Sequence, residues 1–314
     1  MRPRLSVLVP TRGRPDLAAA CVRALLAQPH PSFEVVICDQ SPDEGTARAL
    51  TGADDGSGRL HRVAVDGVGR SRALNAGLPH TRGAWVIFTD DDCTPEPGWL
   101  EAVEAACAGA GADAAVLGPV HPGPVGPGMA IPPATFEDPA PADYAGRIDR
   151  DLIYPNVAVP RAAFARLGGF DERMSVGTPL PGGEDNDFGY RLLRAGYRIL
   201  YRPGPGVIHH AWRTPAARAR LKRDYGVGQG AFYAKHLARA DAWIAWRLVR
   251  DLLRTARASC GAALRGRFAE GAGHARFLGG IFVGLAGMTG LLLRRVPSGE
   301  GAVAAAMRGE RFPS

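Results

Sequence analysis

Cysteine is scarce in this 314-residue chain, and its spacing has no recognisable pattern. Five cysteines occur, an odd number, with no C-x-x-C pair among them: Cys21, Cys38, Cys93, Cys107 and Cys260. This set predicts neither a disulfide framework nor a structural zinc site, and it favours a reducing compartment. The strand-like run Leu5–Val9 near the N-terminus is too short for the core of a signal peptide. We therefore expect a cytoplasmic protein.

Lysine is scarcer still, because the 38 basic residues include only Lys222 and Lys235. The formal net charge is nevertheless +7. This excess predicts an anionic partner, such as a nucleic acid, a nucleotide diphosphate or an acidic membrane surface. Aromatic residues make up only 7% of the chain and do not interleave with basic runs. A single-strand binding groove needs that interleaving, so we expect no nucleic-acid partner.

Long apolar runs are also rare. The segment Phe277–Leu293 has seventeen residues without a charge, flanked by Arg276 and by Arg294 and Arg295. Its length is at the lower limit for a membrane span. Four glycines share one helical face, a pattern found where helices pack closely: Gly280, Gly284, Gly287 and Gly290. We expect a helix packed on the protein or lying at a bilayer interface, and a span stays open as the alternative.

The first 120 residues alternate apolar, β-rich runs with helical patterns. This alternation predicts an α/β fold with a mostly parallel sheet and helices on both faces. The predicted strands are Leu5–Val9, Phe33–Cys38, Leu60–Val65, Trp85–Thr89 and Ala114–Leu117. The predicted helices are Asp16–Ala27, a short helix from Asp43, about Ser71–Ala76, and Pro97–Ala108.

The rest of the chain begins with a segment rich in proline and glycine, residues 119–143, which we predict to be a long loop. A loop of this length in a compact domain is usually functional or mobile. From Thr214 onward the pattern is helical, which predicts a C-terminal helical extension. Between them we predict a strand at Ile153–Val159, a helix from Arg161, a helix at Glu184–Ala195 and a strand at Tyr197–Tyr201.

Polar residues follow three of the predicted strands. The first strand is followed by Pro10, Thr11 and Arg12, the second by Asp39, and the fourth by three consecutive aspartates, Asp90, Asp91 and Asp92. Ligands of open α/β sheets bind beyond the carboxyl ends of the strands. These residues therefore predict a binding site for a nucleotide and its phosphates.

Three adjacent aspartates after a buried strand raise one another's pKa unless cations or hydrogen-bond donors compensate. A solvated acidic turn is the simpler interpretation, but the position directly after W-V-I-F-T favours a metal site. Magnesium-like ions bind one or two protein carboxylates together with substrate phosphates. We predict Mn²⁺ or Mg²⁺ there, serving a nucleotide-diphosphate donor.

Two further segments are candidates for nucleotide contacts. Asp39 could accept hydrogen bonds from a base or ribose, or it could simply be an acid near a helix start. Arg72 and Asn75 follow Gly69 on a predicted helix, where an arginine could meet phosphate or base. A solvated helical arginine is the alternative for Arg72.

A second acidic cluster opens the helix predicted at residues 184–195. Glu184, Asp185 and Asp187 crowd its first turn, where the helix dipole favours negative charge, and Arg191 lies one turn beyond Asp187. Capping of the helix explains only one of these three acids. We therefore expect another, Asp185, to point into a cleft and to act there as a general base. We expect Glu184, Asp187 and Arg191 to contact the acceptor, the molecule whose hydroxyl group would give its proton to this base.

The adjacent histidines His209 and His210 face opposite ways in an extended chain, so at most one can reach the metal. We assign His209 with Asp92 to the metal, and a structural histidine stays the alternative.

From Leu5 to about His236, the chain resembles family 2 glycosyltransferases with the nucleotide-sugar-binding GT-A-type fold. The segments L-S-V-L-V-P-T-R-G-R and V-V-I-C-D-Q-S resemble the first two strands and the base-binding acid of that family. T-D-D-D-C resembles its D-x-D motif, and G-G-F-D-E followed by G-E-D-N-D-F-G-Y-R-L resembles its acceptor-side segment. R-A-L-N-A-G resembles its A-R-N-x-G element, with Leu74 where an arginine is common.

The resemblance implies an inverting transfer of sugar from a nucleotide-diphosphate donor to an acceptor hydroxyl. Asp90 would lie near the ribose, Asp92 would hold the metal and Asp185 would be the base. The acceptor could be a lipid-linked glycan, a cell-wall polymer or a small natural product. Residues 1–120 would bind the donor, 121–212 would bind the acceptor and supply the base, and 213–314 would form helices, in contact with the inner face of the cell membrane.

A haloacid dehalogenase-like phosphohydrolase is the rival interpretation. Asp90 to Thr94 also reads as D-x-D-x-T, in which Asp90 and Asp92 would be the reacting acids. Such an enzyme needs a later lysine near those acids, and only Lys222 and Lys235 are available.

Overall fold

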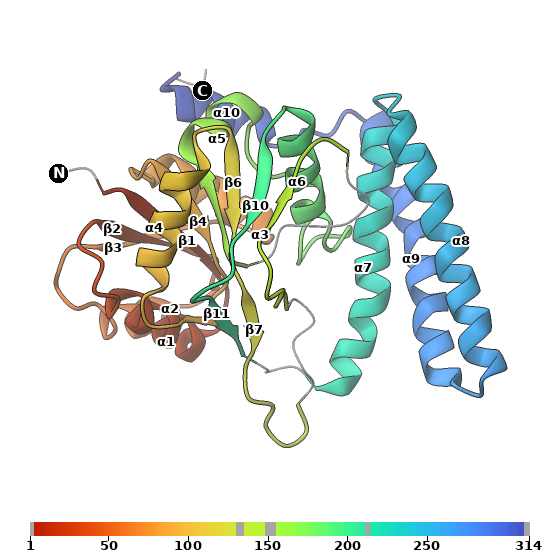
Figure 1. Cartoon of the computed structure of the whole chain (residues 1–314), viewed down its shortest axis with the longest axis horizontal. Helices are drawn as coiled ribbons and strands as arrows, with labels where there is room; N and C mark the ends of the chain where they lie inside the picture. The colour runs from red at the N-terminus through yellow and green to blue at the C-terminus, as the bar shows by residue number, and fades with distance from the viewer. Residues whose placement is uncertain (1–2, 130–134, 148–154, 211–213, 311–314) are drawn as a thin grey trace.

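A computed structural model describes residues 3–129, 135–147, 155–210 and 214–310 (Figure 1). Its centre is an eight-stranded sheet in the order β3-β2-β1-β4-β9-β6-β10-β8. The strands are β1 (Leu5–Thr11), β2 (Phe33–Asp39), β3 (Leu60–Ala64), β4 (Trp85–Phe88), β6 (Ala114–Leu117), β8 (Ala142–Tyr144), β9 (Val157–Pro160) and β10 (Arg198–Tyr201). The mostly parallel α/β fold is confirmed, since only β8 and β9 run antiparallel to their neighbours.

Helices cover both faces of this sheet. One face is covered by α1 (Pro15–Leu26), α2 (Gly45–Thr51) and α4 (Trp99–Ala110), and the other by α3 (Arg70–Gly77), α5 (Arg161–Leu167), α6 (Glu184–Arg194) and α10 (Glu300–Arg308), with a short 3-10 helix η1 (Leu78–His80) after α3. Val7 and Val9 pack toward the first layer, and Leu8 packs toward the second, because side chains alternate along a strand. Covering both faces explains why β1 and β2 are buried along their whole length.

A small second sheet lies beyond the carboxyl ends of the large one. It joins β5 (Cys93–Pro95), β11 (Val207–His209) and β7 (Val120–Pro122). The segment predicted as a loop at residues 119–143 therefore contains β7 and the start of β8, both too short for their sequence to stand out. The predicted strand Ile153–Val159 begins at Val157, and Ile153 and Tyr154 lie outside the described residues.

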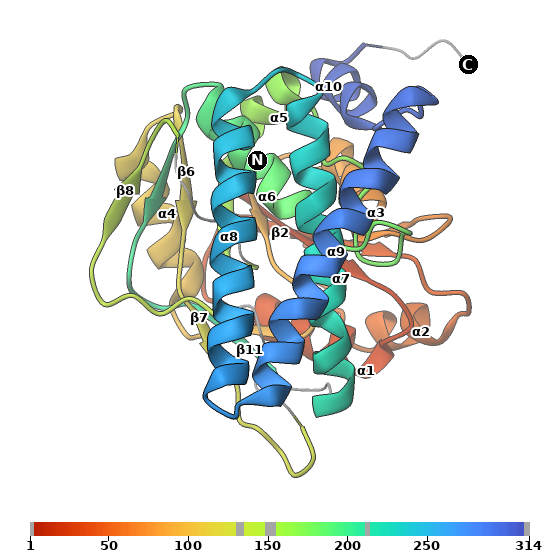
Figure 2. The same ribbon diagram turned by 90° about the vertical axis from the view of Figure 1, so that its right-hand side faces the viewer.

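Three long helices pack beside the sheet domain: α7 (Pro215–Leu237), α8 (Ala242–Leu264) and α9 (Phe268–Leu293) (Figures 1 and 2). Glycines on both α7 and α9 allow these two helices to approach closely. A Cβ atom at Gly226 would collide with the carbonyl of Phe277, and one at Gly284 with the carbonyl of Val227. Among the described residues, α9 is the one helix that is long and apolar enough to cross a bilayer, judged by length and composition alone.

A buried cluster of charges joins α6, α7 and α10. The Nζ atom of Lys235 lies 2.9 Å from Asp171, 2.8 Å from Asp187 and 2.7 Å from Glu300. Arg191 contributes a second cation, with its Nε 2.8 Å from Asp187. The Lys235 side chain is only 1% exposed, so it places a buried positive charge among three carboxylates, each of which has a further cationic partner in Arg173 or Arg191.

Replacing Lys235 by methionine is expected to lower the free energy of unfolding by about 3–5 kcal/mol, because the variant leaves buried carboxylates uncompensated. Lys222 is exposed on the same helix and gives a matched control. Urea unfolding should show a large shift for K235M and almost none for K222M. Equal shifts would mean that the cluster does not stabilise the fold.

Candidate active site

The three aspartates follow β4, at the carboxyl ends of the parallel strands, and cations surround them. Thr11 at the end of β1 donates a hydrogen bond of 2.7 Å to Asp91. Arg14 lies 2.6 Å from Asp91 and 3.3 Å from Asp92. Burial still raises the pKa of Asp91 to about 7, although Arg14 opposes the shift. Asp91 is thus an interior residue of the turn. Asp92 is also buried, at 4% exposed, whereas the Asp90 side chain is a quarter exposed.

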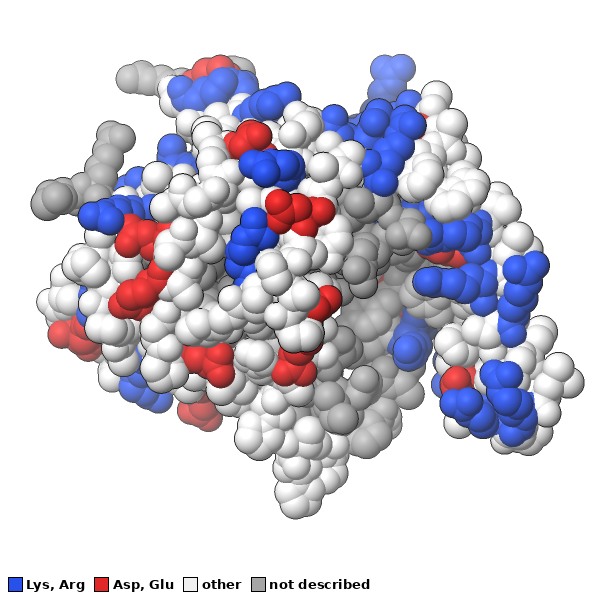
Figure 3. All heavy atoms as spheres, in the orientation of Figure 1, with Lys and Arg blue, Asp and Glu red and all other residues white. Residues whose placement is uncertain are grey.

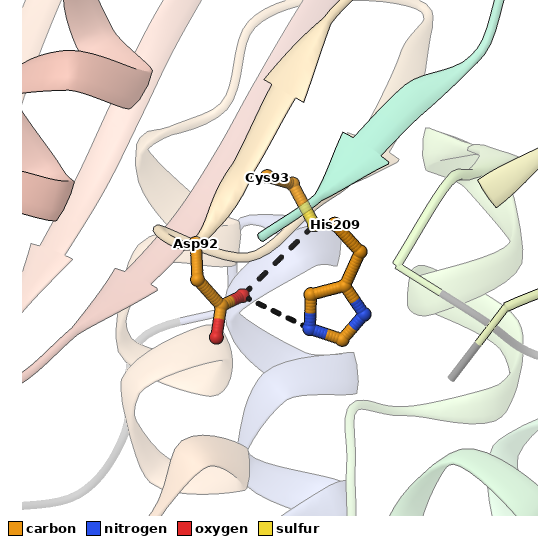
Figure 4. Close-up of side chains that lie close together, drawn as sticks. All are labelled: Asp92, Cys93 and His209. Carbon is orange, nitrogen blue, oxygen red and sulfur yellow. Dashed lines mark hydrogen bonds and ion pairs between the residues drawn. The ribbon is translucent and has the colours of Figure 1, made fainter. Parts of the chain in front are cut away.

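Asp92 forms a group of candidate metal ligands with Cys93 and His209 (Figure 4). One ligand atom from each side chain lies within 4.8 Å of the others. The antiparallel pairing of β5 with β11 creates this group, because it places His209 opposite Cys93. Nε2 of His209 lies 3.5 Å from Oδ1 of Asp92. The other histidine is engaged elsewhere, since Nε2 of His210 lies 2.7 Å from the hydroxyl of Thr94.

The chemistry of these donors fits the predicted metal. A carboxylate and an imidazole suit Mn²⁺, and a carboxylate suits Mg²⁺. Burial holds the pKa of the Cys93 thiol well above its usual value. A protonated thiol is a poor ligand, because cysteine binds metals as the thiolate. Asp92 and His209 are therefore the residues of this group that fit a hard or borderline divalent ion.

Arg70, the first residue of α3, connects the two acidic clusters. Its Nε donates to Asp90 at 3.0 Å, and its Nη1 donates to Asp185 at 2.9 Å. One guanidinium thus spans the gap between the turn after β4 and the start of α6. The triple-aspartate turn and the acid-rich helix start face each other across a single site.

Glu184 lies beside this ion pair but is almost completely buried. Its side chain is 3% exposed, its Oε2 atom has no hydrogen-bond partner among the described residues, and Arg70 approaches its other oxygen only to 3.7 Å. Burial raises the pKa of Glu184 to about 8, and the adjacent charge of Asp185 adds to the shift. Glu184 is thus protonated at neutral pH, while Asp185 is one-third exposed and paired with Arg70.

This raised pKa predicts a pH-dependent stability. The folded pKa exceeds the unfolded value of 4.5, so the protonated form contributes stability that is fully present below pH 4.5 and is lost as the pH rises to about 8. The variant Glu184→Gln has no carboxyl group to deprotonate here, so this fall in stability is absent from it. Its free energy of unfolding relative to the natural protein should increase with pH across this range, as measured by urea unfolding. Exposed Glu44→Gln is the control, and a pH-independent difference for E184Q would contradict the shifted pKa.

The other predicted donor-side residues lie at the carboxyl ends of β1 and β2. Pro10 and Thr11 are buried, and Arg12 is exposed just beyond β1. Asp39 is 3% exposed and already has partners, since it accepts from Arg62 at 2.9 Å and from the backbone of Ser41 at 2.9 Å. These residues line the same edge of the sheet as Asp90 to Asp92.

Asn75 and Arg72 both contact the segment between α5 and α6. Asn75 is buried, and its amide group binds the backbone of Phe170 in both directions at 2.8 Å. Asn75 therefore fixes the turn that follows α5. Arg72 is half exposed and lies 3.2 Å from Glu172. On this helix it is Arg70, two residues earlier, that bonds Asp90 and Asp185.

The predicted acceptor contacts of Asp187 and Arg191 also differ from the structure. Asp187 is fully buried in the cluster around Lys235, with His236 as a further partner at 2.9 Å. Arg191 bonds the carbonyls of Leu167 and Gly169 in addition to Asp187. Both residues are interior supports of α6. The helical periodicity could have predicted this difference, because Asp187 lies one turn before the buried Arg191 on the same face of α6, whereas Asp185 is one-third exposed.

Three residues of the site were not foreseen: Arg70, Arg14 and Cys93. The sequence could have predicted Arg70, because this residue stands at the first turn of a helix that begins at the carboxyl edge of the sheet. Arg14 and Cys93 depend on contacts between distant segments, namely α1 with the turn after β4 and β5 with β11.

Residues 6–167 match the sequence profile of glycosyl transferase family 2. Succinoglycan biosynthesis protein ExoM of Rhizobium meliloti is 31% identical over 238 residues, which cover 72% of this chain and 73% of that protein. O-antigen biosynthesis protein RfbC of Myxococcus xanthus is 27% identical over 73% of this chain. The match spans only 19% of RfbC, and a match to glycosyltransferase AglE of Haloferax volcanii spans 38% of that relative.

Solved structures share the fold. A mannosyltransferase of Pyrobaculum calidifontis, in complex with GDP-Man and Mn²⁺, superimposes with a TM-score of 0.58 at 19% identity, covering 90% of this chain and 88% of the other. TarS residues 1–349 of S. aureus, in complex with UDP-GlcNAc, superimpose with a TM-score of 0.59 at 17% identity, covering 99% and 93%. Similarity extends over the helical region as well as the sheet.

Proposed function

The chain belongs to glycosyl transferase family 2, and from this membership and the geometry of its cleft we propose an inverting, metal-dependent transfer of sugar from a nucleotide-diphosphate donor to an acceptor hydroxyl. One observation carries the proposal. Arg70 bonds Asp90 on one side and Asp185 on the other, so a donor bound at the aspartate turn has a carboxylate opposite it. A donor-binding group and a base on unconnected surfaces could not perform this reaction.

The donor would lie along the carboxyl edge of β1, β2 and β4. Pro10, Thr11 and Arg12 would border the nucleotide, Asp39 would accept from the base or ribose, and Asp90 would lie near the ribose. Related folds bind GDP-Man and UDP-GlcNAc, so a nucleotide sugar suits this architecture. Asp91 supports the turn through Thr11 and Arg14.

We assign the metal to Asp92 and His209. A bound Mn²⁺ or Mg²⁺ would stabilise the negative charge that develops on the departing diphosphate. Arg14 is the nearby protein cation, at 3.3 Å from Asp92, and it holds that carboxylate in place. Arg70 adds a positive charge at the centre of the cleft, where a phosphate oxygen can replace Asp90 as its partner.

Asp185 would be the general base. In a single displacement, the acceptor oxygen forms a bond to the anomeric carbon while the bond from that carbon to the diphosphate breaks. The hydroxyl proton passes to Asp185, and the electron pair of the broken bond leaves with the diphosphate. The sugar configuration inverts, and no covalent sugar–enzyme intermediate forms.

We propose that the three segments of the chain have the functions that the sequence suggests. Residues 1–120 bind the donor, residues 121–212 supply the base and the acceptor side, and residues 213–314 form the helical region of a cytoplasmic enzyme that touches the membrane. The boundary at 212 lies outside the described residues. The acceptor is a glycan, a lipid-linked saccharide or a small hydroxyl compound.

A panel of nucleotide sugars with Mn²⁺ and candidate acceptors tests this proposal. The expected result is release of nucleoside diphosphate together with a product whose new linkage has the inverted anomeric configuration by NMR. A retained configuration would contradict the single displacement. Hydrolysis of sugar phosphates without any nucleotide donor would instead support the phosphohydrolase. The structure does not favour that rival, because Lys235 binds Asp171, Asp187 and Glu300 and not the aspartate turn.

A further inference from the structure

The outer face of α8 is apolar along most of its length. Its exposed side chains recur every three or four residues, which places them on one side of the helix. Trp246 is 48% exposed, Val249 56%, Leu253 51% and Leu264 89%. Buried side chains of the same helix, such as Ile244 and Thr255, point the other way. The exposed face therefore has no partner among the described residues.

The outer face of α9 has the same character. The exposed positions Phe268, Phe282 and Leu293 recur at helical spacing, with alanines, a glycine and a threonine between them. The opposite face of α9 packs against α7, because Gly280 and Gly284 lie against the carbonyls of Arg223 and Val227. The glycine face thus holds α9 on the protein, and the outer face stays uncovered.

Arginines border this apolar surface. Between residues 242 and 267 there are six arginines and one acid, Asp251. Asp251 is buried and bonded to Tyr233, Arg247 and Arg250, so it adds little negative charge to the outside. Arg254, Arg257, Arg265 and Arg267 are exposed. Figure 3 shows basic side chains gathered over these helices.

The turn between α8 and α9 lies at the same end of the molecule as β11 and the loop after β7 (Figures 1 and 2). That end carries the carboxyl edge of the sheet, where β11 contributes His209 to the site. Two highly exposed apolar residues lie at this turn, namely Leu264, which is 89% exposed, and Phe268, which is 72% exposed. The apolar surface therefore reaches the level of the cleft.

We propose that the outer faces of α8 and α9, together with their connecting turn, bind an anionic lipid bilayer as an interfacial surface and do not cross it. Exposed apolar side chains enter the acyl boundary while the bordering arginines meet lipid phosphates, as in amphipathic interfacial helices. Crossing the bilayer would require α9 to leave its glycine contacts with α7. One consequence for catalysis is that the acceptor is carried by the membrane, and this consequence rests on the proposed function. The binding of α8 and α9 to the bilayer does not rest on it.

Vesicle flotation of the full chain tests the proposal. We expect the protein to float with vesicles of phosphatidylcholine mixed with phosphatidylglycerol, and much less with phosphatidylcholine alone. The variant R254Q/R257Q/R265Q should weaken partitioning about fivefold for each arginine removed. The variant L264S/F268S should weaken it at least about tenfold, because each lost apolar side chain removes buried area. R4Q/R23Q/R48Q, which removes three exposed arginines of the sheet domain, is the charge-matched control.

Cys260 offers a probe at its natural position. It is exposed on α8, whereas the other four cysteines are buried. An environment-sensitive fluorophore on Cys260 should shift to shorter wavelength with anionic vesicles and be quenched by nitroxide-labelled lipids. Circular dichroism of each variant shows whether it is folded.

Several outcomes would overturn the proposal. Equal flotation of the surface variants and the control would do so, as would retention in vesicles after alkaline carbonate extraction, which indicates a span. A stable dimer by light scattering, together with no flotation, would assign the surface to a second copy of the chain. The catalytic variant D185N should float like the natural protein, so a failure of the proposed chemistry remains distinguishable from a failure of membrane binding.

Discussion

Replacing Asp185 by asparagine is expected to lower kcat roughly 10²–10⁴-fold, the range associated with losing a general base. Asparagine keeps the size and one oxygen of the side chain, so it can still accept the hydrogen bond that Arg70 donates at 2.9 Å. The fold and the donor site should therefore remain intact. Steady-state kinetics should show a fall in kcat with a nearly unchanged KM for the nucleotide sugar.

The control for this variant is Asp43→Asn, an exposed acid outside the cleft. It should keep full activity. Asp185 is not the base if D185N retains more than about a tenth of the natural kcat, since that loss is below the range for general-base catalysis. A rise in KM alone would indicate that Asp185 only binds substrate.

Replacing Asp92 by asparagine should produce the second largest loss, roughly 10²–10³-fold in kcat, comparable with removal of one preorganised charge-stabilising group. Asp92 supplies the carboxylate of the candidate metal group, and His209 is neutral as a ligand. The asparagine variant should bind Mn²⁺ more weakly in a titration of free Mn²⁺ by electron paramagnetic resonance. Chelation with EDTA should abolish activity of the natural protein, and added Mn²⁺ should restore it.

Exposed Asp54→Asn provides the matched change of charge outside the site. Full activity after exhaustive chelation would overturn the metal assignment. Normal Mn²⁺ affinity in D92N would show instead that the ion binds elsewhere. Replacing His209 by alanine should weaken Mn²⁺ binding less than D92N does, because an imidazole contributes no charge.

The strands and acidic clusters were predictable because the signals are local. Apolar runs such as Val35–Cys38 indicate strands buried on both faces, and the residues that follow parallel strands must gather at one edge. The turn Asp90–Asp92 was located from the strand before it, and the start of α6 at Glu184 was located from its cluster of acids after two glycines. The direction of β9 was not predictable, because a short apolar run reads the same whether its neighbours are parallel or antiparallel.

The partners of individual polar residues were much harder to predict. Asp185 and Asp187 are two residues apart on one helix, yet the first faces the cleft and the second lies within a charge cluster. Their difference depends on Lys235 and Glu300, which arrive from α7 and α10. Arg70 and Arg72 are likewise similar in sequence, and only the packing of α3 on the turn near Ser175 decides which one reaches the acids. Sequence periodicity cannot resolve contacts made by distant segments.

The cluster around Lys235 also affects the order in which a newly synthesised chain matures. Glu300 leaves the ribosome 65 residues after Lys235, and until it docks the interior cations have one carboxylate fewer. The positive charges of Lys235 and of Arg191, which lies on the helix of the proposed base, are therefore fully compensated only late in synthesis. A nascent chain whose sheet has already formed would still lack this carboxylate beside α6, and the cluster is complete only when the C-terminal helices have closed around it.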